Sequence, residues 1–139
     1  MAKELFVDTG AWVALADLDD RHHSRAAETF PTLLGEHQRL VTTNLVVAET
    51  YILLRLTLGH GPAIAFLDNL ETSPRIERVY ATPDLDVDAE EILRRYRDQT
   101  FSFTDALSFA LMHRRRISTA FAFDTHFATA GFVCVPSPS

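Results

Sequence analysis

The sequence predicts an α/β fold, a three-layer α/β/α sandwich around a central, mostly parallel sheet of four or five strands. Short apolar runs that suit strands alternate with longer segments that suit helices along the whole chain. Strands separated by helices in this way form parallel sheets with helices on both faces. The length of 139 residues and the lack of repeats, low-complexity segments or linkers predict one domain, residues 1–139.

The first third of the chain predicts two strands and two helices. Residues 5–7 are a short apolar strand that runs directly into an apolar helix. A second helix is expected over residues 23–34, with Ser24 as a candidate N-cap and Gly35 able to end it. Residues 39–42 are the second strand.

The middle of the chain predicts a helical pair and a third strand. Thr43 or Asn44 can cap a long helix that ends at Gly59. Pro62 suits the first turn of the next helix, because a proline there removes no helical hydrogen bond. Residues 75–81 alternate well enough to form a strand.

The last third predicts two more helices and one or two strands. Residues 83–99 open with acidic side chains, which the positive end of a helix dipole favours. Ser102 or Thr104 can cap the following helix, which closes with three arginines. Residues 117–123 are a clear strand, and residues 132–135 can add an edge strand.

Composition excludes several classes of protein. No segment approaches the ~20 apolar residues that span a bilayer, which argues against a membrane role. The N-terminus reaches an acidic residue at once and lacks a secretory pattern, so a cytoplasmic location is expected. The lone Cys134 excludes an internal disulfide and a multi-cysteine zinc site, and its apolar neighbours predict a packing role.

The net charge of −6 argues at first against a nucleic-acid partner, because phosphate binding depends on lysine and arginine. If several acids gather around a metal, however, the remaining surface is nearly neutral. The arginines within residues 94–97 and 114–116 can then contact a phosphate backbone. Solvated helix faces and helix C-termini explain the same arginines equally well.

Two strands are each followed by an aspartate. Asp8 comes after residues 5–7, and Asp124 comes after residues 117–123. Ligands of open parallel sheets bind beyond the carboxyl ends of the strands, so both residues lie where chemistry is expected. Either aspartate alone is commonly only a turn former or helix cap.

Glu49 lies in a helix with apolar residues on almost every side. Successive residues are about 100° apart around a helix axis, which places Glu49 between Leu45, Leu53 and Leu56. We therefore predict that Glu49 avoids the solvated face. A buried carboxylate must be neutral, paired with an arginine or bound to a metal, because burying it ionised and unpaired is too costly.

Asp105 falls in the first turn of its helix, where its charge stabilises the helix by ~0.3–1 kcal/mol on its own. Four acids from separate segments are expected to converge at one end of the sheet, where they would repel one another without a cation. Oxygen ligands of this kind suit Mg²⁺ or Mn²⁺. Such a metal activates water and neutralises phosphate charge, which is hydrolytic nuclease chemistry. The pattern does not decide which acid serves as the base.

Four segments resemble the PIN-domain family and, more narrowly, its VapC-type toxin ribonucleases. They occur in the family's order and span most of the chain: Phe6-Val-Asp-Thr-Gly-Ala-Trp-Val-Ala-Leu, Val41-Thr-Thr-Asn-Leu-Val-Val-Ala-Glu-Thr, Ser102-Phe-Thr-Asp-Ala-Leu-Ser-Phe-Ala and Ala120-Phe-Ala-Phe-Asp-Thr-His-Phe. Each segment is a weak signal alone, and the four together are specific.

The resemblance implies a PIN-like fold and a divalent-metal-dependent endoribonuclease, with Asp8, Glu49, Asp105 and Asp124 as both its catalytic and its metal-binding residues. It implies Mg²⁺ or Mn²⁺ as cofactor, RNA as substrate, a homodimer, and, for the toxin of a type II toxin–antitoxin pair, a cognate antitoxin.

Two positions depart from the family's pattern. Gly10 stands where relatives usually have serine, and Ala122 where many have threonine or serine. The missing hydroxyls put catalytic strength in question. Thr9, Thr43 and Thr104 can supply hydroxyls near the acids, or can simply cap helices.

Other functions fit the residues less well. A haloacid-dehalogenase-type phosphatase needs a second aspartate at the position of Gly10, and a receiver domain needs a late lysine, whereas the sole lysine is Lys3. A non-catalytic PIN-fold module that binds RNA or a protein, and a nuclease of RNA maturation or flap DNA outside a toxin–antitoxin pair, remain alternatives.

The histidines predict no zinc site. His22 and His23 are adjacent, so on a helix they diverge too far to chelate one ion, and we interpret them as surface or packing residues. His126 follows Asp124 closely enough to touch a substrate phosphate, although a solvated loop position is the expectation.

Overall fold

Strands and helices alternate along residues 2–137, the part of the chain that this computed structural model describes. In chain order they are β1 (Ala2–Val7), α1 (Thr9–Ala16), α2 (His23–Glu36), β2 (His37–Thr43), α3 (Asn44–Leu58), α4 (His60–Thr72), β3 (Ile76–Val79), α5 (Pro83–Arg95), α6 (Phe103–Arg115), β4 (Thr119–Phe121), α7 (His126–Thr129) and β5 (Val133–Val135). Within these residues the strands form one five-stranded sheet in the order β3-β2-β1-β4-β5, and every neighbouring pair is parallel.

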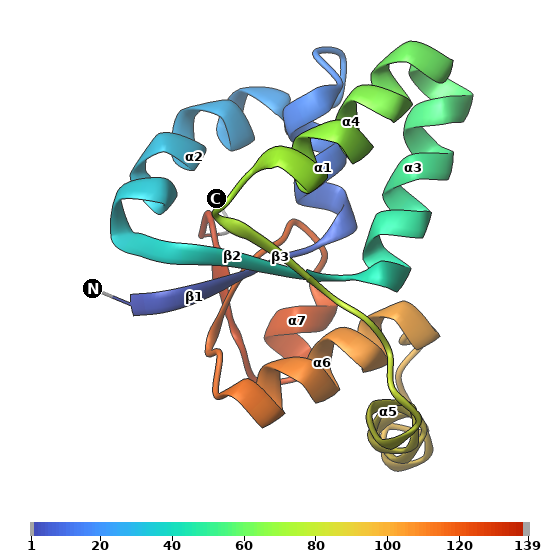
Figure 1. The fold of residues 1–139 in the computed structure, drawn as a ribbon. Helices are drawn as coiled ribbons and strands as arrows, with labels where there is room; N and C mark the ends of the chain where they lie inside the picture. The colour runs from blue at the N-terminus through green and yellow to red at the C-terminus, as the bar shows by residue number, and fades with distance from the viewer. Residues whose placement is uncertain (1, 138–139) are drawn as a thin grey trace.

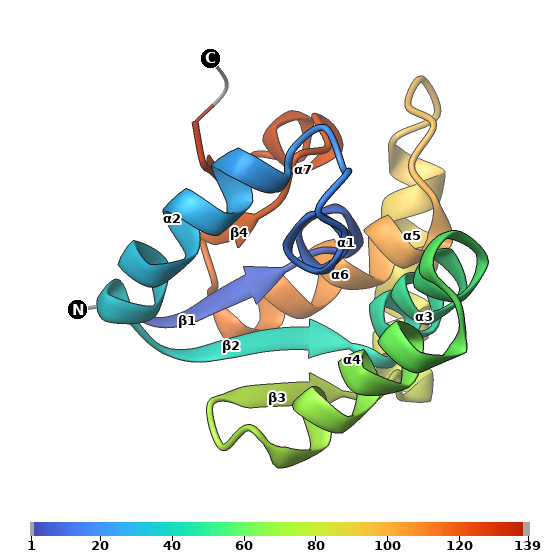
Figure 2. The same cartoon turned by 90° about the horizontal axis from the view of Figure 1, so that it is seen from above.

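The helices cover both faces of the sheet, as the sequence predicts. Figure 1 shows α1 to α4 on one side and α5 to α7 on the other, and Figure 2 gives the same arrangement from above. The helices lie on both faces because a crossover connection between two parallel strands is right-handed. The chain moves outward from β1 to β3 and then returns to β4 on the opposite side of β1, so the later helices must cross the other face.

This reversal creates a switch point between β1 and β4. The backbone N–H of Asp8, just after β1, donates a hydrogen bond to the carbonyl of Phe121 at the end of β4, over 3.1 Å. Ligands of open α/β sheets bind at such a point, outside the carboxyl ends of the strands. The fold therefore places the residues after β1 and β4 beside a natural binding edge.

Buried apolar side chains fix the elements that reach this edge. Leu5, Phe6 and Val7 of β1 have no exposed surface. In α6 every residue from Asp105 to Met112 is buried, so this helix crosses the core and carries an acid inward with it. None of the helices in the described part of the chain has the length and apolar character that crossing a bilayer requires.

Several predicted boundaries differ from the structure. Strand β4 ends at Phe121, so a short loop separates it from Asp124. Helix α2 continues through Gly35 to Glu36 and is preceded by His22, not by a Ser24 cap. The short α7 was not predicted, because four residues are too few to show helical periodicity.

Hydroxyl caps follow the sequence more closely. The Thr43 hydroxyl accepts a hydrogen bond from the Val46 N–H at the start of α3, and the Ser102 hydroxyl accepts one from the Asp105 N–H at the start of α6. These caps are predictable because the donor and acceptor are only three residues apart.

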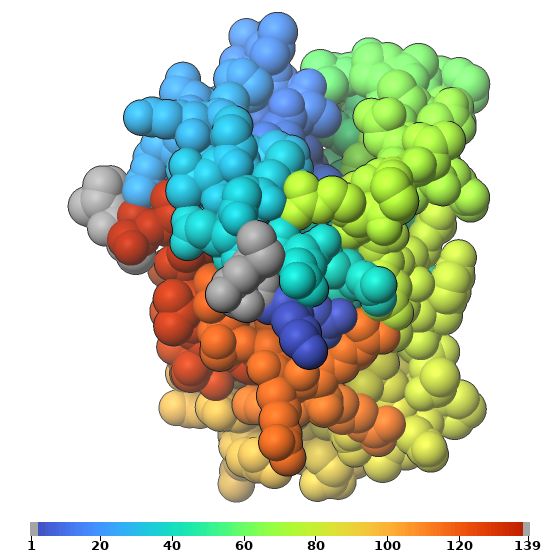
Figure 3. Space-filling model, turned by 60° about the vertical axis from the view of Figure 1, so that its left-hand side comes forward, coloured from blue at the N-terminus to red at the C-terminus, as the bar shows by residue number. Residues whose placement is uncertain are grey.

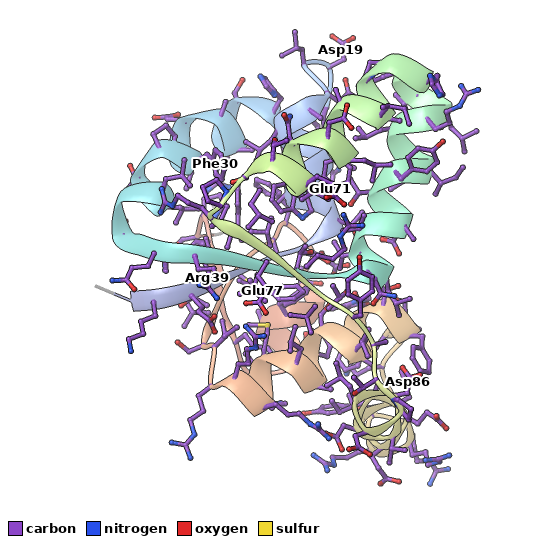
Figure 4. The ribbon with its side chains drawn as sticks, in the orientation of Figure 1. Asp19, Phe30, Arg39, Glu71, Glu77 and Asp86 are labelled. Carbon is purple, nitrogen blue, oxygen red and sulfur yellow. The ribbon has the colours of Figure 1, made fainter. Side chains whose placement is uncertain are left out.

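The arginines that end α6 lie at the opposite end of the sheet from the switch point. Arg115 contacts Glu77 over 2.6 Å and Glu4 over 3.2 Å, and Arg39 also contacts Glu77. Figure 4 labels Arg39 and Glu77, and Figure 3 shows the face where the start of β1 meets the end of α6. Hydrogen bonds from Arg115 lower the pKa of Glu77 to about 2. Arg115 therefore ties strands together, and this arginine run does not reach the predicted acids.

Candidate functional site: an acidic edge at the switch point

Asp8 begins the site directly after the central strand. Its residue surface is only 6% exposed, and its backbone carbonyl accepts the hydrogen bonds that open α1. Asp8 occupies the N-cap position of α1, yet its side chain makes no capping hydrogen bond. Helix capping therefore does not account for a carboxyl group buried here.

Asp105 reaches the same edge from the first turn of the buried α6. Its Oδ2 accepts a hydrogen bond from the Ser102 N–H over 3.1 Å, and its own N–H donates to the Ser102 hydroxyl over 3.0 Å. This reciprocal pair is a capping box, so the expected helix-stabilising role is real. The same Oδ2 also lies 2.9 Å from Nδ1 of His126, which gives Asp105 a second role in the site.

Asp124 lies in the loop after β4. Its Oδ1 accepts a hydrogen bond from the His126 backbone N–H over 2.8 Å and lies 3.4 Å from His126 Nδ1. The Asp124 side chain is 42% exposed, so its carboxylate faces solvent while Asp8 and Asp105 are buried. The loop thus presents one acid to an incoming ligand beside two that are enclosed.

The prediction that Glu49 avoids the solvated face of its helix is wrong. The sequence places it among apolar residues on a buried side of its helix, but in the structure Glu49 is exposed. The misleading neighbours Leu53 and Leu56 are themselves 42% and 77% exposed. Apolar residues around a helix predict burial only where another element covers them, and among residues 2–137 nothing covers this face. Glu49 is also absent from the ion pairs found among those residues.

Asp8 nevertheless lies within electrostatic range of the other three predicted acids. Burial is the largest cause that raises the pKa of Asp8, which reaches about 7 from an ordinary value of 3.8. A hydrogen bond from the backbone of Thr9 opposes the shift, whereas the negative charges of Asp105, Asp124 and Glu49 add to it. Asp8 therefore lies within electrostatic range of acids from three other segments.

His126 is the site residue that sequence reasoning underrated. The expectation of a solvated loop histidine is wrong, since its side chain is 25% exposed and its ring packs edge-on against Phe101, with centroids 5.2 Å apart. An aspartate two residues earlier was the available signal, because aspartate side chains often accept the backbone N–H two residues on. That turn brings the following ring to the acids.

This donor set can hold a divalent cation. Among the described residues, Asp105, Asp124 and His126 offer ligand atoms that lie within 4.8 Å of one another. Asp8 stands outside that tight group but is buried in reach of its charges. Carboxylate oxygens are the usual ligands of Mg²⁺ and Mn²⁺. A cation here would offset the burial and the repulsion that raise the pKa of Asp8.

A comparison with protein families decides the class of this chain. The family profile described as the PIN domain matches residues 5–133, nearly all of the sequence. The chain belongs to the PIN-domain family. The fold and the family expected from the four sequence segments are thereby confirmed.

Within that family, the chain is similar to a characterised toxin. It is 39% identical over 130 residues to the 23S rRNA-specific endonuclease VapC20 of Mycobacterium tuberculosis, with 93% of this chain and 95% of the relative covered. The crystal structure of VapC20, described as a Sarcin-Ricin loop cleaving toxin, superposes with a TM-score of 0.86 at 36% identity, covering 93% and 96% of the two chains.

More distant structures share the fold alone. VapBC2 from Rickettsia felis matches with a TM-score of 0.69 at 12% identity, over 94% of this chain and 96% of that one. FitAcB from Neisseria gonorrhoeae matches with a TM-score of 0.62 at 18% identity, over 94% and 95%.

The PIN-domain site keeps one free hydroxyl and lacks two others. Thr43 is used as a helix cap, but the buried Thr9 hydroxyl, next to Asp8, has no hydrogen-bond partner among the described residues. A side chain at Gly10 would meet nothing within 4 Å, so packing does not explain the missing serine. Ala122 lines a hollow of about 260 Å³ beside Asp124, with His22, Arg25 and Cys134 in its wall.

The remaining candidates have structural roles or make no ion pair among the described residues. His22 stacks on Phe123, and His23 hydrogen-bonds the carbonyl of Ala14, which agrees with their interpretation as surface or packing residues. Arg95 and Arg97 are exposed and form no ion pair within residues 2–137. The ring of Tyr96 between them packs on Phe101, which in turn contacts His126.

Proposed function

We propose that this chain is a divalent-metal-dependent endoribonuclease, acting as a single domain over residues 1–139, and the toxin of a type II toxin–antitoxin pair. The observation that carries the proposal is the burial of Asp8 at the switch point within reach of three other carboxylates. The identity of 39% to a 23S rRNA-specific endonuclease supports the same activity. A non-catalytic module would have no use for so unfavourable a cluster.

Asp8, Glu49, Asp105 and Asp124 are the residues that we assign to the metal and to catalysis, with Mg²⁺ or Mn²⁺ as the ion. When bound, the ion lowers the pKa of a water and neutralises charge on the phosphate and leaving oxygen. The backbone of Asp8 is held at a strand end, and the side chain of Asp105 is held in a capping box, so the Asp105 carboxylate is positioned before substrate arrives. Arg95 and Arg97 are free to contact the phosphates of an RNA strand.

We infer the sarcin–ricin stem-loop of 23S rRNA as the substrate, because the similar toxin VapC20 is described as cleaving that loop. With Mn²⁺ or Mg²⁺, the purified chain should cut a synthetic RNA of this loop at one position. Removing the metal with EDTA should slow the reaction by about 10³-fold or more, since metal charge stabilisation amounts to several kcal/mol. Adding Mn²⁺ back should restore the rate.

A sequence-scrambled RNA hairpin is the control for substrate choice, and the exposed Asp68→Asn variant is the control for a change of charge. Equal cleavage in EDTA would contradict a metal mechanism. Absence of any cleavage of the loop in Mn²⁺ would contradict the substrate assignment.

A homodimer is proposed from the exposed face of α3. Ile52, Leu53 and Leu56 are 46%, 42% and 77% exposed and follow Glu49 at spacings that place all four on one helix face. A contiguous apolar face of this kind marks an interaction surface. A second copy of the chain would cover these apolar residues, and Glu49 would then lie near the dimer interface.

Light scattering of the wild type is therefore expected to give twice the monomer mass at micromolar concentration, and Leu56→Glu should give the monomer. Replacing the exposed Leu18, which lies in the loop after α1, by glutamate is the matched control and should leave the dimer intact. A wild-type monomer would contradict the proposed interface.

The toxin assignment also requires a cytoplasmic location with the RNA substrate and a cognate antitoxin. A short reading frame beside the gene, whose product binds this chain and stops RNA cleavage, would distinguish a toxin from a nuclease of RNA maturation.

A further inference from the structure

His126 contacts the two acids that the later segments bring to the site. Its Nδ1 lies 2.9 Å from Asp105 Oδ2 and 3.4 Å from Asp124 Oδ1. Its backbone N–H holds Asp124 over 2.8 Å, and Phe101 packs edge-on against its ring. Backbone, ring packing and partial burial thus hold the imidazole between two carboxylates that come from α6 and from the loop after β4.

These distances match those between neighbouring ligands of one metal ion. An octahedral ion with ligand bonds of about 2.0–2.1 Å keeps adjacent ligand atoms about 3 Å apart. The two separations from Nδ1 are 2.9 and 3.4 Å, and the three possible ligand atoms all lie within 4.8 Å of one another. A neutral imidazole with its proton on Nε2 would direct the Nδ1 lone pair toward an ion placed between the carboxylates.

We propose that His126 supplies a nitrogen ligand to the divalent cation, beside Asp105 and Asp124, and that it makes the site prefer Mn²⁺ to Mg²⁺. The proposal rests on the proposed metal-dependent function and deepens it. Imidazole binds later, softer divalent metals better than the hard Mg²⁺, which keeps oxygen ligands and waters. A nitrogen ligand adds a preference for Mn²⁺ that carboxylate oxygens do not supply.

A purely structural histidine would make the same hydrogen bond to Asp105, so the deciding measurement must detect a metal–nitrogen bond. Pulsed electron paramagnetic resonance of the full chain loaded with Mn²⁺ reports ¹⁴N coupling only when a nitrogen is coordinated. We expect this coupling in the wild type, and its absence in His126→Asn. His60→Asn, at an exposed histidine that begins α4, is the matched control and should keep it.

Calorimetric titration supplies the second readout, which does not depend on catalysis. Mn²⁺ affinity should fall by at least about tenfold in His126→Asn, since the variant removes the nitrogen ligand that Mn²⁺ accepts more readily than Mg²⁺ does. Mg²⁺ affinity should change by less than about threefold, because its preferred ligands are oxygens and waters. The spectrum of the wild type tests the nitrogen ligand even if the variant folds poorly.

The possible results distinguish a failure of the histidine ligand from a failure of the proposed metal-dependent ribonuclease activity. A wild type that binds Mn²⁺ and cuts RNA but shows no ¹⁴N coupling would overturn the histidine ligand and leave the nuclease intact. Equal losses of Mn²⁺ and Mg²⁺ affinity in His126→Asn would also overturn it. A wild type that binds neither ion and cuts no RNA would overturn both.

Discussion

Asp8→Asn is expected to reduce metal-dependent RNA cleavage by about 10³-fold or more, because it removes a charged ligand from the enclosed part of the site. Asn keeps the size of the side chain, so the backbone hydrogen bond to Phe121 and the start of α1 should persist. Single-turnover cleavage of the stem-loop RNA in Mn²⁺ measures the loss. Glu49→Gln should cause a similar loss through a different position in the site.

The two variants should differ in stability. Glu49 is exposed, so Glu49→Gln is expected to leave the free energy of unfolding within about 0.5 kcal/mol of the wild type. Asp68→Asn, at an exposed position on α4, is the control that should change neither cleavage nor stability. Wild-type cleavage rates in both acid variants would refute the assignment of these carboxylates.

In the metal-free protein, the free energy of unfolding is expected to fall as pH rises from about 4 to about 7. Burial raises the pKa of Asp8 to about 7 from an ordinary value of 3.8, so between these values the folded state holds a proton that the unfolded state has lost. Stability is therefore full below the lower value and is lost as pH rises through the upper one. The difference between the two pKa values of Asp8 corresponds to a loss of about 4 kcal/mol in the free energy of unfolding.

The charged groups near Asp8 also favour a loss of stability as pH rises. Asp105, Asp124 and Glu49 add negative charge, and burial raises the pKa of the Cys134 thiol, with smaller contributions from Asp124 and Asp8. Urea unfolding in EDTA at several pH values measures the slope. Asp8→Asn cannot ionise at this position, so its metal-free stability should exceed that of the wild type at pH 8 by several kcal/mol.

Bound metal should remove the same penalty in the wild type. A cation favours the ionised form of a neighbouring carboxylate, so Mn²⁺ is expected to raise wild-type stability most above pH 7 and to have little effect on Asp8→Asn. Equal pH dependence of the wild type and Asp8→Asn in EDTA would contradict the raised pKa. No metal-dependent stabilisation at pH 8 would count against the cation site.

Local patterns were sufficient for much of this protein. Alternation of strands and helices predicted a parallel sheet, because that order leaves few other ways to bury apolar surface. The positions of Asp8 and Asp105 followed from a strand end and a helix start, which are set by neighbouring residues. The proximity of Asp8 and Asp124 could be predicted, since the carboxyl ends of parallel strands share one edge of the sheet.

Tertiary packing decided what these patterns left open. The sequence by itself determined the α/β class, narrowed each of two helix caps to a pair of neighbouring residues, and placed Asp8 just after a strand, all of which depend on near neighbours or on chain order. Only the structure showed that Glu49 is exposed and that His126 joins Asp105 and Asp124. Burial and side-chain contact depend on segments distant in sequence, and periodicity within one helix carries no information about what covers it.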